Sequence, residues 1–272
     1  RSTMKSKFLA GPYIAWMAIF TVVPLGMVAY FAFTTPAGDF TFSNFANASE
    51  YLPIFLRSIW YALAACVICL VVGYPVAYVI AKSTVNVQRV LYLLVTLPMC
   101  MSFLLRTLAL VSLVRDTGII NSFLGIFGIG PLPLIRNSGS VIMGMVYNYL
   151  PYMIMPLYTV IVKLDPRLIE AAQDLGCDTV QTFRRVILPL SVPGIVSGIT
   201  MVFVPAVSTF YISQKLGATE NIMVGDIIET QFKGSLNRNL GAAMSLILML
   251  LVFVSIGLMN RFSGDDEEVA TI

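Results

Sequence analysis

The sequence predicts an all-α integral membrane protein with six membrane-spanning helices. Of its 272 residues, 58% are hydrophobic and only 11% are charged, whereas soluble proteins carry roughly 25% charged residues because their surfaces face water. Six apolar stretches are also long enough for a helix to cross a bilayer, which takes about 20 residues. They are residues 13–33, 58–81, 90–113, 140–162, 192–213 and 241–260.

The distribution of lysine and arginine predicts the orientation of these spans. Ten of these cations fall on one side: Arg1, Lys5, Lys7, Lys82, Arg89, Lys163, Arg167, Arg184, Arg185 and Arg261. Six fall on the other side: Arg57, Arg115, Arg136, Lys215, Lys233 and Arg238. Because cytoplasmic loops are enriched in lysine and arginine, both termini are expected in the cytoplasm. The first span is expected to be a retained anchor, since its apolar run is longer than that of a signal peptide, and the acidic segment 265–272 is expected to be a solvated polar tail.

Six prolines lie at or near the middle of the first five spans: Pro24, Pro75, Pro98, Pro151, Pro156 and Pro205. Each removes a backbone donor and bends its helix. A membrane tolerates this where neighbouring helices or cavity water satisfy the freed carbonyl groups. The pattern therefore favours bent helices around a cavity, as in a transporter, over a straight anchoring bundle.

Several kinds of chemistry are excluded by what the sequence lacks. It contains no histidine, which excludes a histidine-based catalytic triad or metal site, and no other cluster of nucleophiles, acids or metal ligands favours an integral-membrane enzyme. The net charge of +3 is too small to indicate nucleic-acid binding. The glycine-rich segment 125–131 lacks the lysine of a phosphate-binding loop. If the protein pumps a solute, a partner must therefore supply the energy.

The predicted spans contain almost no charge. All fourteen carboxylates lie outside them, although carriers driven by protons or sodium generally bind the coupling ion with ionisable groups or unwound backbone near the middle of the membrane. The exception is Arg106 in the third span, which stays protonated and is a poor proton relay. A secondary carrier is therefore disfavoured. Arg106 suits a cation pathway only if it faces a partner or backbone carbonyl groups, and a structural role is an equal alternative.

The connection between the fourth and fifth spans, residues 164–190, predicts a rigid helical elbow. Asp165 can cap a first helix with Pro166 in its first turn, and Gly176 is placed to end that helix in a left-handed conformation. Residues 178–181 (Asp-Thr-Val-Gln) form a capping-box pattern for a second helix, 179–187, that is expected to stop ahead of Pro189. An interfacial hairpin without a partner is the alternative.

This elbow resembles the signature loop of ABC importer permeases, E-A-A-x3-G-x9-I-x-L-P. The matching residues are Glu170-Ala171-Ala172, Gly176 and Val186-Ile187-Leu188-Pro189, with valine where isoleucine is usual at 186. The resemblance implies that residues 1–272 form one permease domain of the MetI-like, or type I, fold. It also implies that the elbow docks on a cytosolic ATPase subunit through Glu170, Ala171, Ala172, Asp174, Gly176, Asp178, Phe183 and Pro189.

Residues 141–194, 205–225 and Gly73-Tyr74-Pro75 resemble the spermidine/putrescine permeases of this family. That implies a multi-pass subunit of a bacterial cytoplasmic membrane, paired with a second, related permease, two ATPase subunits and an extracytoplasmic polyamine-binding protein. ATP and Mg²⁺ would be held by the ATPases, and this chain would have neither catalytic residues nor a cofactor. The alternatives are a same-family permease for an amino acid, thiamine or an iron chelate, and, with less support, a secondary carrier or channel.

Aromatic and neutral polar side chains of the fourth and fifth spans are candidates for a polyamine pathway: Tyr147, Asn148, Tyr149, Tyr152, Ser208, Phe210 and Tyr211. Aromatic faces attract ammonium groups by about 0.5–2 kcal/mol each, and the absence of carboxylates would keep binding weak enough for release. Taken singly, each tyrosine is more often a packing or interfacial residue. Outside the membrane, Glu220, Asp226 and Glu229 are candidates for receiving the cation or contacting the binding protein.

Overall fold

The computed structural model describes residues 12–13, 16–128, 130–233 and 237–263. Apart from an isolated β-bridge between Thr34 and Phe40, the regular structure in these ranges is helical, as predicted. The chain divides into two compact units, residues 1–53 with 227–252 and residues 54–226 with 253–272. The predicted acidic tail, 265–272, lies outside the described residues.

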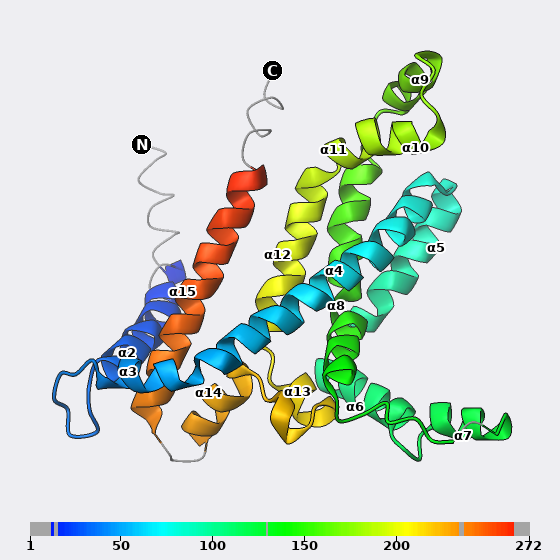
Figure 1. The fold of residues 1–272 in the computed structure, drawn as a ribbon. Coiled ribbons are helices and arrows are strands. Elements are labelled where there is room, and N and C mark those ends of the chain that lie inside the picture. Colours follow the sequence, from blue (N-terminus) through cyan, green and yellow to red (C-terminus); the bar gives the residue numbers. More distant parts are fainter. Residues whose placement is uncertain (1–11, 14–15, 129, 234–236, 264–272) are drawn as a thin grey trace, which may run out of the picture. The chain divides into compact units, whose positions relative to one another are not determined.

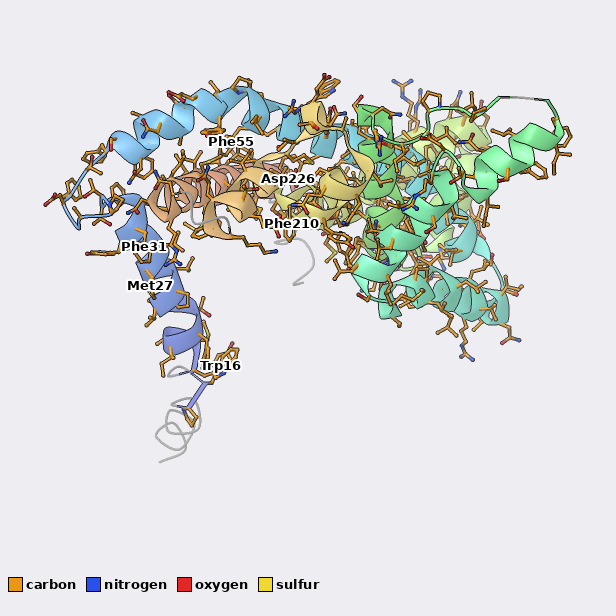
Figure 2. The ribbon with its side chains drawn as sticks, turned by 90° about the horizontal axis from the view of Figure 1, so that it is seen from below. Trp16, Met27, Phe31, Phe55, Phe210 and Asp226 are labelled. Carbon is orange, nitrogen blue, oxygen red and sulfur yellow. The ribbon has the colours of Figure 1, made fainter. Side chains whose placement is uncertain are left out.

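The first unit contains a π-helical turn, Ala18–Val22, followed by α2 (Val23–Ala32), α3 (Ser43–Ala48), η2 (Ser49–Tyr51) and the first part of α15 (Arg238–Ser263). Trp16, Met27 and Phe31 follow one another along its first helical segment (Figure 2). Small residues let α2 and α15 approach closely, because Ala32, Ala242 and Ala243 are fully buried together.

Two asparagine side chains satisfy the carbonyl groups that are left free where α2 ends. The amide of Asn44 donates to the carbonyl oxygens of Ala32 (3.0 Å) and Thr34 (2.9 Å). The amide of Asn239 donates to the carbonyl oxygen of Phe31 at 3.0 Å. The last four carbonyl groups of a helix have no partner within it, so these bonds tie α3 and α15 to the end of α2.

The second unit holds most of the chain (Figure 1). Its helices are α4 (Leu52–Lys82, from residue 54 on), α5 (Val85–Thr96), η3 (Leu97–Cys100), α6 (Phe103–Val114), α7 (Ile119–Ile126), α8 (Ser138–Ile161), α9 (Pro166–Asp174), α10 (Thr179–Thr182), η4 (Phe183–Ile187), α11 (Leu188–Leu190), α12 (Val192–Ser208), α13 (Tyr211–Leu216), η5 (Thr219–Asn221), the first residues of α14 (Val224–Lys233) and the last part of α15.

The two ends of the second unit differ in what they carry. Helices α9 and α10 lie at one end, together with the ends of α4 and α8 that are followed by Ser83 and Val162 (Figure 1). Helices α6 and α13 lie at the opposite end. Lys82 therefore lies at the elbow end and Lys215 at the other, as the predicted topology requires. Which of these ends faces the cytoplasm stays a prediction.

The third predicted span, 90–113, is bent near Pro98 as expected, and the bend is sharp enough to interrupt the helix. Helix α5 and η3 end at Cys100, and the segment from α6 onward is bent by 96° from them. Pro98 provides no backbone donor, Met101 and Ser102 are extended, and α6 begins after Ser102 in the N-cap position. Arg106 therefore lies beyond a sharp bend rather than inside a continuous span.

The fifth predicted span, 192–213, is also interrupted. Helix α12 ends at Ser208, Thr209 is extended, and α13 starts only at Tyr211. By length and composition, two helical stretches among the described residues qualify as membrane-crossing, or up to five if each bent pair counts as one span, and Ala18–Ala32 is a shorter apolar helix. The exact number of six spans stays a prediction.

Glycines allow α12 to pack closely against α8, the most extensive helix contact in the second unit. A Cβ atom on Gly198 would lie 2.6 Å from Sδ of Met153, and one on Gly194 would lie 3.1 Å from the carbonyl oxygen of Pro156. The two glycines are four residues apart on α12, the small-xxx-small spacing that brings membrane helices together. Close contact between α8 and α12 is therefore encoded by residue size.

Replacing Gly198 with leucine is expected to destabilise the protein, because the added side chain must displace Met153 on α8. Overpacking of this kind costs about 1–3 kcal/mol, and the apparent melting temperature of the purified chain in detergent measures it. Gly257→Leu is the matched control, because a Cβ at this helical position meets nothing within 4 Å. Equal melting temperatures of the two variants would contradict the packing assigned to Gly198.

Candidate functional site

The first helix of the elbow is capped at both ends by the residues that the sequence indicated. The Asp165 carboxylate accepts a hydrogen bond from the Arg167 backbone N–H at 2.9 Å, with Pro166 in the first turn. At the other end Gly176 has a φ of +84°. The backbone N–H of Cys177 donates to the Ala172 carbonyl at 3.0 Å, which completes a Schellman motif. Both predicted caps are confirmed.

The second helix of the elbow starts as predicted but ends later. The Asp178 carboxylate accepts from the Gln181 N–H at 2.7 Å. The expected stop ahead of Pro189 was wrong, because the helix continues through Phe183–Ile187 as a π turn and on to Leu190. In a π turn the backbone bonds reach one residue further, here from Leu188 N–H to the Phe183 carbonyl. The change of register just before Pro189 lets the helix accommodate a residue that has no N–H.

The base of the elbow is fixed to α4 by aromatic side chains and a buried hydrogen bond. The Phe183 ring contacts the rings of Tyr74 and Tyr78 edge to face, with centroids 5.4 and 6.3 Å apart. The hydroxyl groups of Tyr74 and Ser191 are 2.8 Å apart and buried. Ser191 lies between the elbow and α12, so the end of the elbow and the start of α12 share one attachment to α4.

The predicted coupling residues fall into two groups. Six are exposed: Glu170, Ala171, Asp174, Gly176, Asp178 and Pro189. Ala172 is buried at 8% exposure, and Phe183 is directed toward α4, so these two hold the elbow together and do not form its outer surface.

Sequence reasoning missed the two most exposed large apolar residues of the elbow. Leu175 is 87% exposed and Val180 is 72% exposed. They flank the turn at Gly176, whose conformation projects them outward. Their hydrophobicity close to the predicted turn at Gly176 was the signal that could have identified them. The elbow tip therefore presents apolar as well as acidic groups.

Five of the seven predicted pathway residues line one pocket of about 390 Å³: Tyr149, Tyr152, Ser208, Phe210 and Tyr211. The interruption between α12 and α13 places Phe210 and Tyr211 there, and the bend before α6 adds Phe103, Leu104 and Arg106. The Phe103 ring lies 6.3 Å from the rings of both Tyr149 and Tyr211. The pocket is thus an aromatic chamber built where two spans break.

The remaining two predicted pathway residues lie outside this chamber. Tyr147 is 46% exposed and does not line the pocket. Asn148 is fully buried, and its amide donates to the Thr107 hydroxyl at 3.2 Å and to the Gly144 carbonyl at 2.9 Å. Asn148 therefore ties α8 to α6.

The three extracytoplasmic candidates have different surroundings. Asp226 is 5% exposed, and its carboxylate accepts from the Ser213 hydroxyl at 2.6 Å and the Met223 N–H at 2.7 Å. Glu229 pairs with Lys233 one helical turn on. Glu220 is exposed, and its carbonyl oxygen accepts from the Arg57 guanidinium. As placed, Asp226 organises the start of α14 and is not a surface group.

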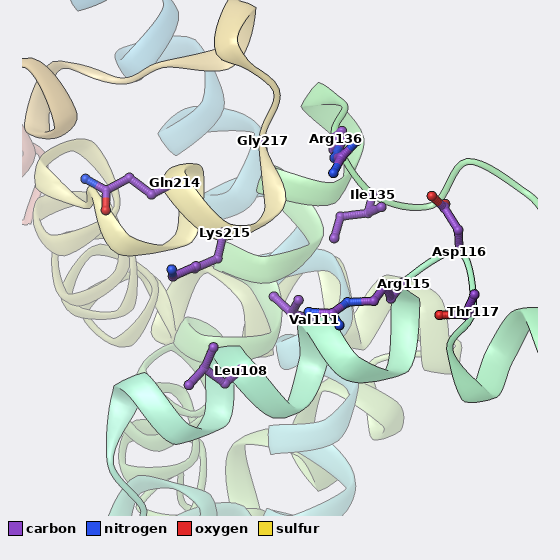
Figure 3. A pocket seen from close by; sticks show the side chains of 10 residues that line it. All are labelled: Leu108, Val111, Arg115, Asp116, Thr117, Ile135, Arg136, Gln214, Lys215 and Gly217. Carbon is purple, nitrogen blue, oxygen red and sulfur yellow. The ribbon is translucent and has the colours of Figure 1, made fainter.

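A basic pocket of about 600 Å³ occupies the end of the second unit away from the elbow (Figure 3). Arg115 follows α6, Arg136 precedes α8 and Lys215 belongs to α13, and all three line it together with Asp116. Arg136 has a φ of +63°, and its N–H donates to the Leu216 carbonyl at 2.8 Å. The distribution of lysine and arginine placed these three cations on one side of the membrane, but only acidic residues were expected to form a binding surface there.

Comparison with known proteins agrees with this architecture. The family model described as "Binding-protein-dependent transport system inner membrane component" matches residues 23–264. The chain is 36% identical to the spermidine/putrescine transport system permease protein PotB of Haemophilus influenzae, over 88% of this chain and 89% of that protein. It is 35% identical to PotB of Escherichia coli, over 88% and 90% of the two chains.

Solved structures show the same fold. A bacterial ABC transporter involved in the import of the acidic polysaccharide alginate has a chain with a TM-score of 0.73 and 18% identity, covering 96% of this chain and 97% of that one. The MetI-like fold expected from the elbow motif is thereby confirmed. The chain belongs to the binding-protein-dependent transport system inner membrane components, the membrane permease subunits of ABC importers, which are not themselves catalytic because the ATPase resides in partner subunits.

Proposed function

We propose that this chain is one permease subunit of an ATP-driven importer that carries spermidine, putrescine or both across the bacterial cytoplasmic membrane. It would pair with a second, related permease and work with two ATPase subunits and an extracytoplasmic polyamine-binding protein. Both termini would be cytoplasmic. ATP and Mg²⁺ would be bound by the ATPases alone.

The elbow supports the energy-coupling part of this proposal. It is rigid because both helices are capped, and its base is attached to α4 through Tyr74 and Phe183. Its tip presents Leu175, Val180 and Glu170 to a partner. Closure of two ATPases would then move the elbow as one body and rock α12 with it, the kind of rigid-body motion by which such switches work.

The aromatic chamber supports the assignment of polyamines as the solute, together with the 35–36% identity to the permeases named above. Tyr211 already faces an ammonium group, since Nζ of Lys215 lies 5.7 Å from the centroid of its ring. The neutral hydroxyl groups of Ser208 and Thr209 add hydrogen-bond acceptors. None of the described residues lining the chamber is a carboxylate, so a polycation would be attracted without being trapped.

Replacing Leu175 with aspartate is expected to weaken binding of the ATPase subunit. A leucine that becomes buried in an interface contributes about 1.5–3 kcal/mol, or roughly a 10- to 150-fold change in affinity. Titration of purified ATPase against the permease pair in nanodiscs measures this. Ile126→Asp is the control, because Ile126 is also exposed (78%) but belongs to α7. Unchanged ATPase affinity in Leu175→Asp would remove the elbow tip from the interface.

Replacing Gly176 with arginine is expected to uncouple ATP hydrolysis from uptake. An L-residue at a φ of +84° is strained by about 1–2 kcal/mol, and the long side chain would enter the docking surface. Uptake by the reconstituted transporter should fall at least roughly tenfold while the affinity of the binding protein for its solute is unchanged, and Glu170→Ala should act in the same direction. Gly128→Arg is the control, with a φ of +74° outside the elbow. Wild-type uptake in Gly176→Arg would contradict the docking assignment.

The substrate assignment is tested by uptake with labelled spermidine. Unlabelled putrescine and spermidine should compete, whereas amino acids, thiamine and iron chelates should not. Tyr211→Leu should reduce the kcat/KM of uptake by roughly 2- to 30-fold, corresponding to one lost cation–π contact, and Tyr147→Leu, outside the chamber, should not. Competition by one of the other solutes instead of polyamines would overturn the substrate assignment and leave the importer assignment standing.

A further inference from the structure

Arg106 is a buried cation that the described residues leave without an acceptor. It lies on α6, is 4% exposed and lines the aromatic chamber beside Tyr149 and Phe103. Its Nε and Nη1 atoms are buried and have no hydrogen-bond partner within the described residues. No described carboxylate lies within ion-pair distance of it.

A guanidinium group stays protonated in proteins, so it cannot avoid this situation by becoming neutral. A buried charge without a partner is strongly unfavourable, and removing one member of a buried ion pair is more damaging than replacing both. The acceptor for Arg106 must therefore come from outside the described part of the chain. A guanidinium N–H that faces the chamber can donate to a carboxylate oxygen there, and such charge-assisted hydrogen bonds are stronger than neutral ones.

We propose that Arg106 receives a carboxylate side chain of the second permease subunit, at the shared wall of the translocation pathway. This inference rests on the proposed function, which supplies both the second permease and a polycationic solute. Charge complementarity identifies the occupant. A polyamine cannot neutralise Arg106, and the chamber walls offer a cation only aromatic rings and hydroxyl groups. We therefore assign the acid to the other half of the pathway.

The pairing also gives Arg106 a role in transport. While it holds the partner's carboxylate, that acid is neutralised and cannot trap a passing cation. An ammonium group of the solute that enters the chamber competes with the guanidinium for the same carboxylate. The polycation would thus meet an acid that is already paired with a fixed cation, which favours release of the polycation from the chamber. Arg106 acts as a positioning residue for that acid.

Chemical cross-linking tests the pairing directly. Arg106→Lys places a primary amine at the chamber, and a membrane-permeant carbodiimide activates a neighbouring carboxyl group so that the amine forms an amide with it. We expect a covalent dimer of the two permeases in the complete transporter, with mass spectrometry locating the bond at position 106 and an acidic residue of the second permease. Leu105→Lys is the control, because Leu105 is 60% exposed and does not line the chamber.

A second pair of variants provides a test that does not need Arg106→Lys to assemble. Arg106→Leu should reduce uptake at least roughly tenfold, since it leaves a buried acid unpaired. Each pathway aspartate or glutamate of the second permease is then changed to its amide together with Arg106→Leu. One of these substitutions should remove the unpaired acid and so restore assembly and part of the uptake. Wild-type uptake in Arg106→Leu, or failure of every such substitution to restore it, would overturn the proposal.

The outcomes separate this inference from the proposed function. If no second permease and no ATPase accompany the wild-type chain in membranes, the proposed function itself fails. If they accompany it but Arg106→Lys gives no cross-link above the Leu105→Lys control, only the pairing of Arg106 fails. If an anionic solute protects the amine introduced by Arg106→Lys from chemical modification, the site binds solute instead. That result would also overturn the pairing.

Discussion

The structure depends on one attachment, the contact of the elbow base with α4. A helical hairpin that projects from a membrane can transmit force only if it moves together with the spans behind it. The Phe183 ring against Tyr74 and Tyr78 and the buried pairing of the Tyr74 and Ser191 hydroxyls make the elbow, α4 and the start of α12 one mechanical body. The close packing of α12 on α8 at Gly194 and Gly198 extends that body toward the opposite end.

The aromatic chamber arises from the places where helices fail to continue. The bend before α6 and the break after Ser208 bring Phe103 and Tyr211 to the wall that also carries Tyr149. The three rings belong to three different predicted spans and meet at one pocket. Because α12 begins just after the elbow, across a 64° bend, and ends at the break at Thr209, it connects the elbow to the chamber. The two halves of the candidate site are thus connected through α12, which under the proposed function would link the ATPases to the solute.

Much of this arrangement could be predicted from the sequence because it depends on local chemistry. Asp165, Gly176 and Asp178 are capping residues whose preferences act within a few positions, and each occupies its expected place. The breaks could not be predicted in the same way, since a proline indicates that a helix is perturbed but not whether the helix continues through it, as at Pro75, or ends, as after Pro98. Burial depends on long-range packing, which is why Asp226 and Ala172 were taken for surface residues and the exposed Leu175 was overlooked.

The central claim is that the elbow tip lies in the cytoplasm and is held by an ATPase subunit. Photo-cross-linking tests it most directly, with a light-activated amino acid incorporated in place of Leu175 in otherwise intact cells. A covalent adduct with the ATPase subunit, increased when nucleotide closes the ATPases, is the predicted result. An adduct with an extracytoplasmic protein, or labelling of the same position by a reagent that cannot cross the membrane, would contradict the account.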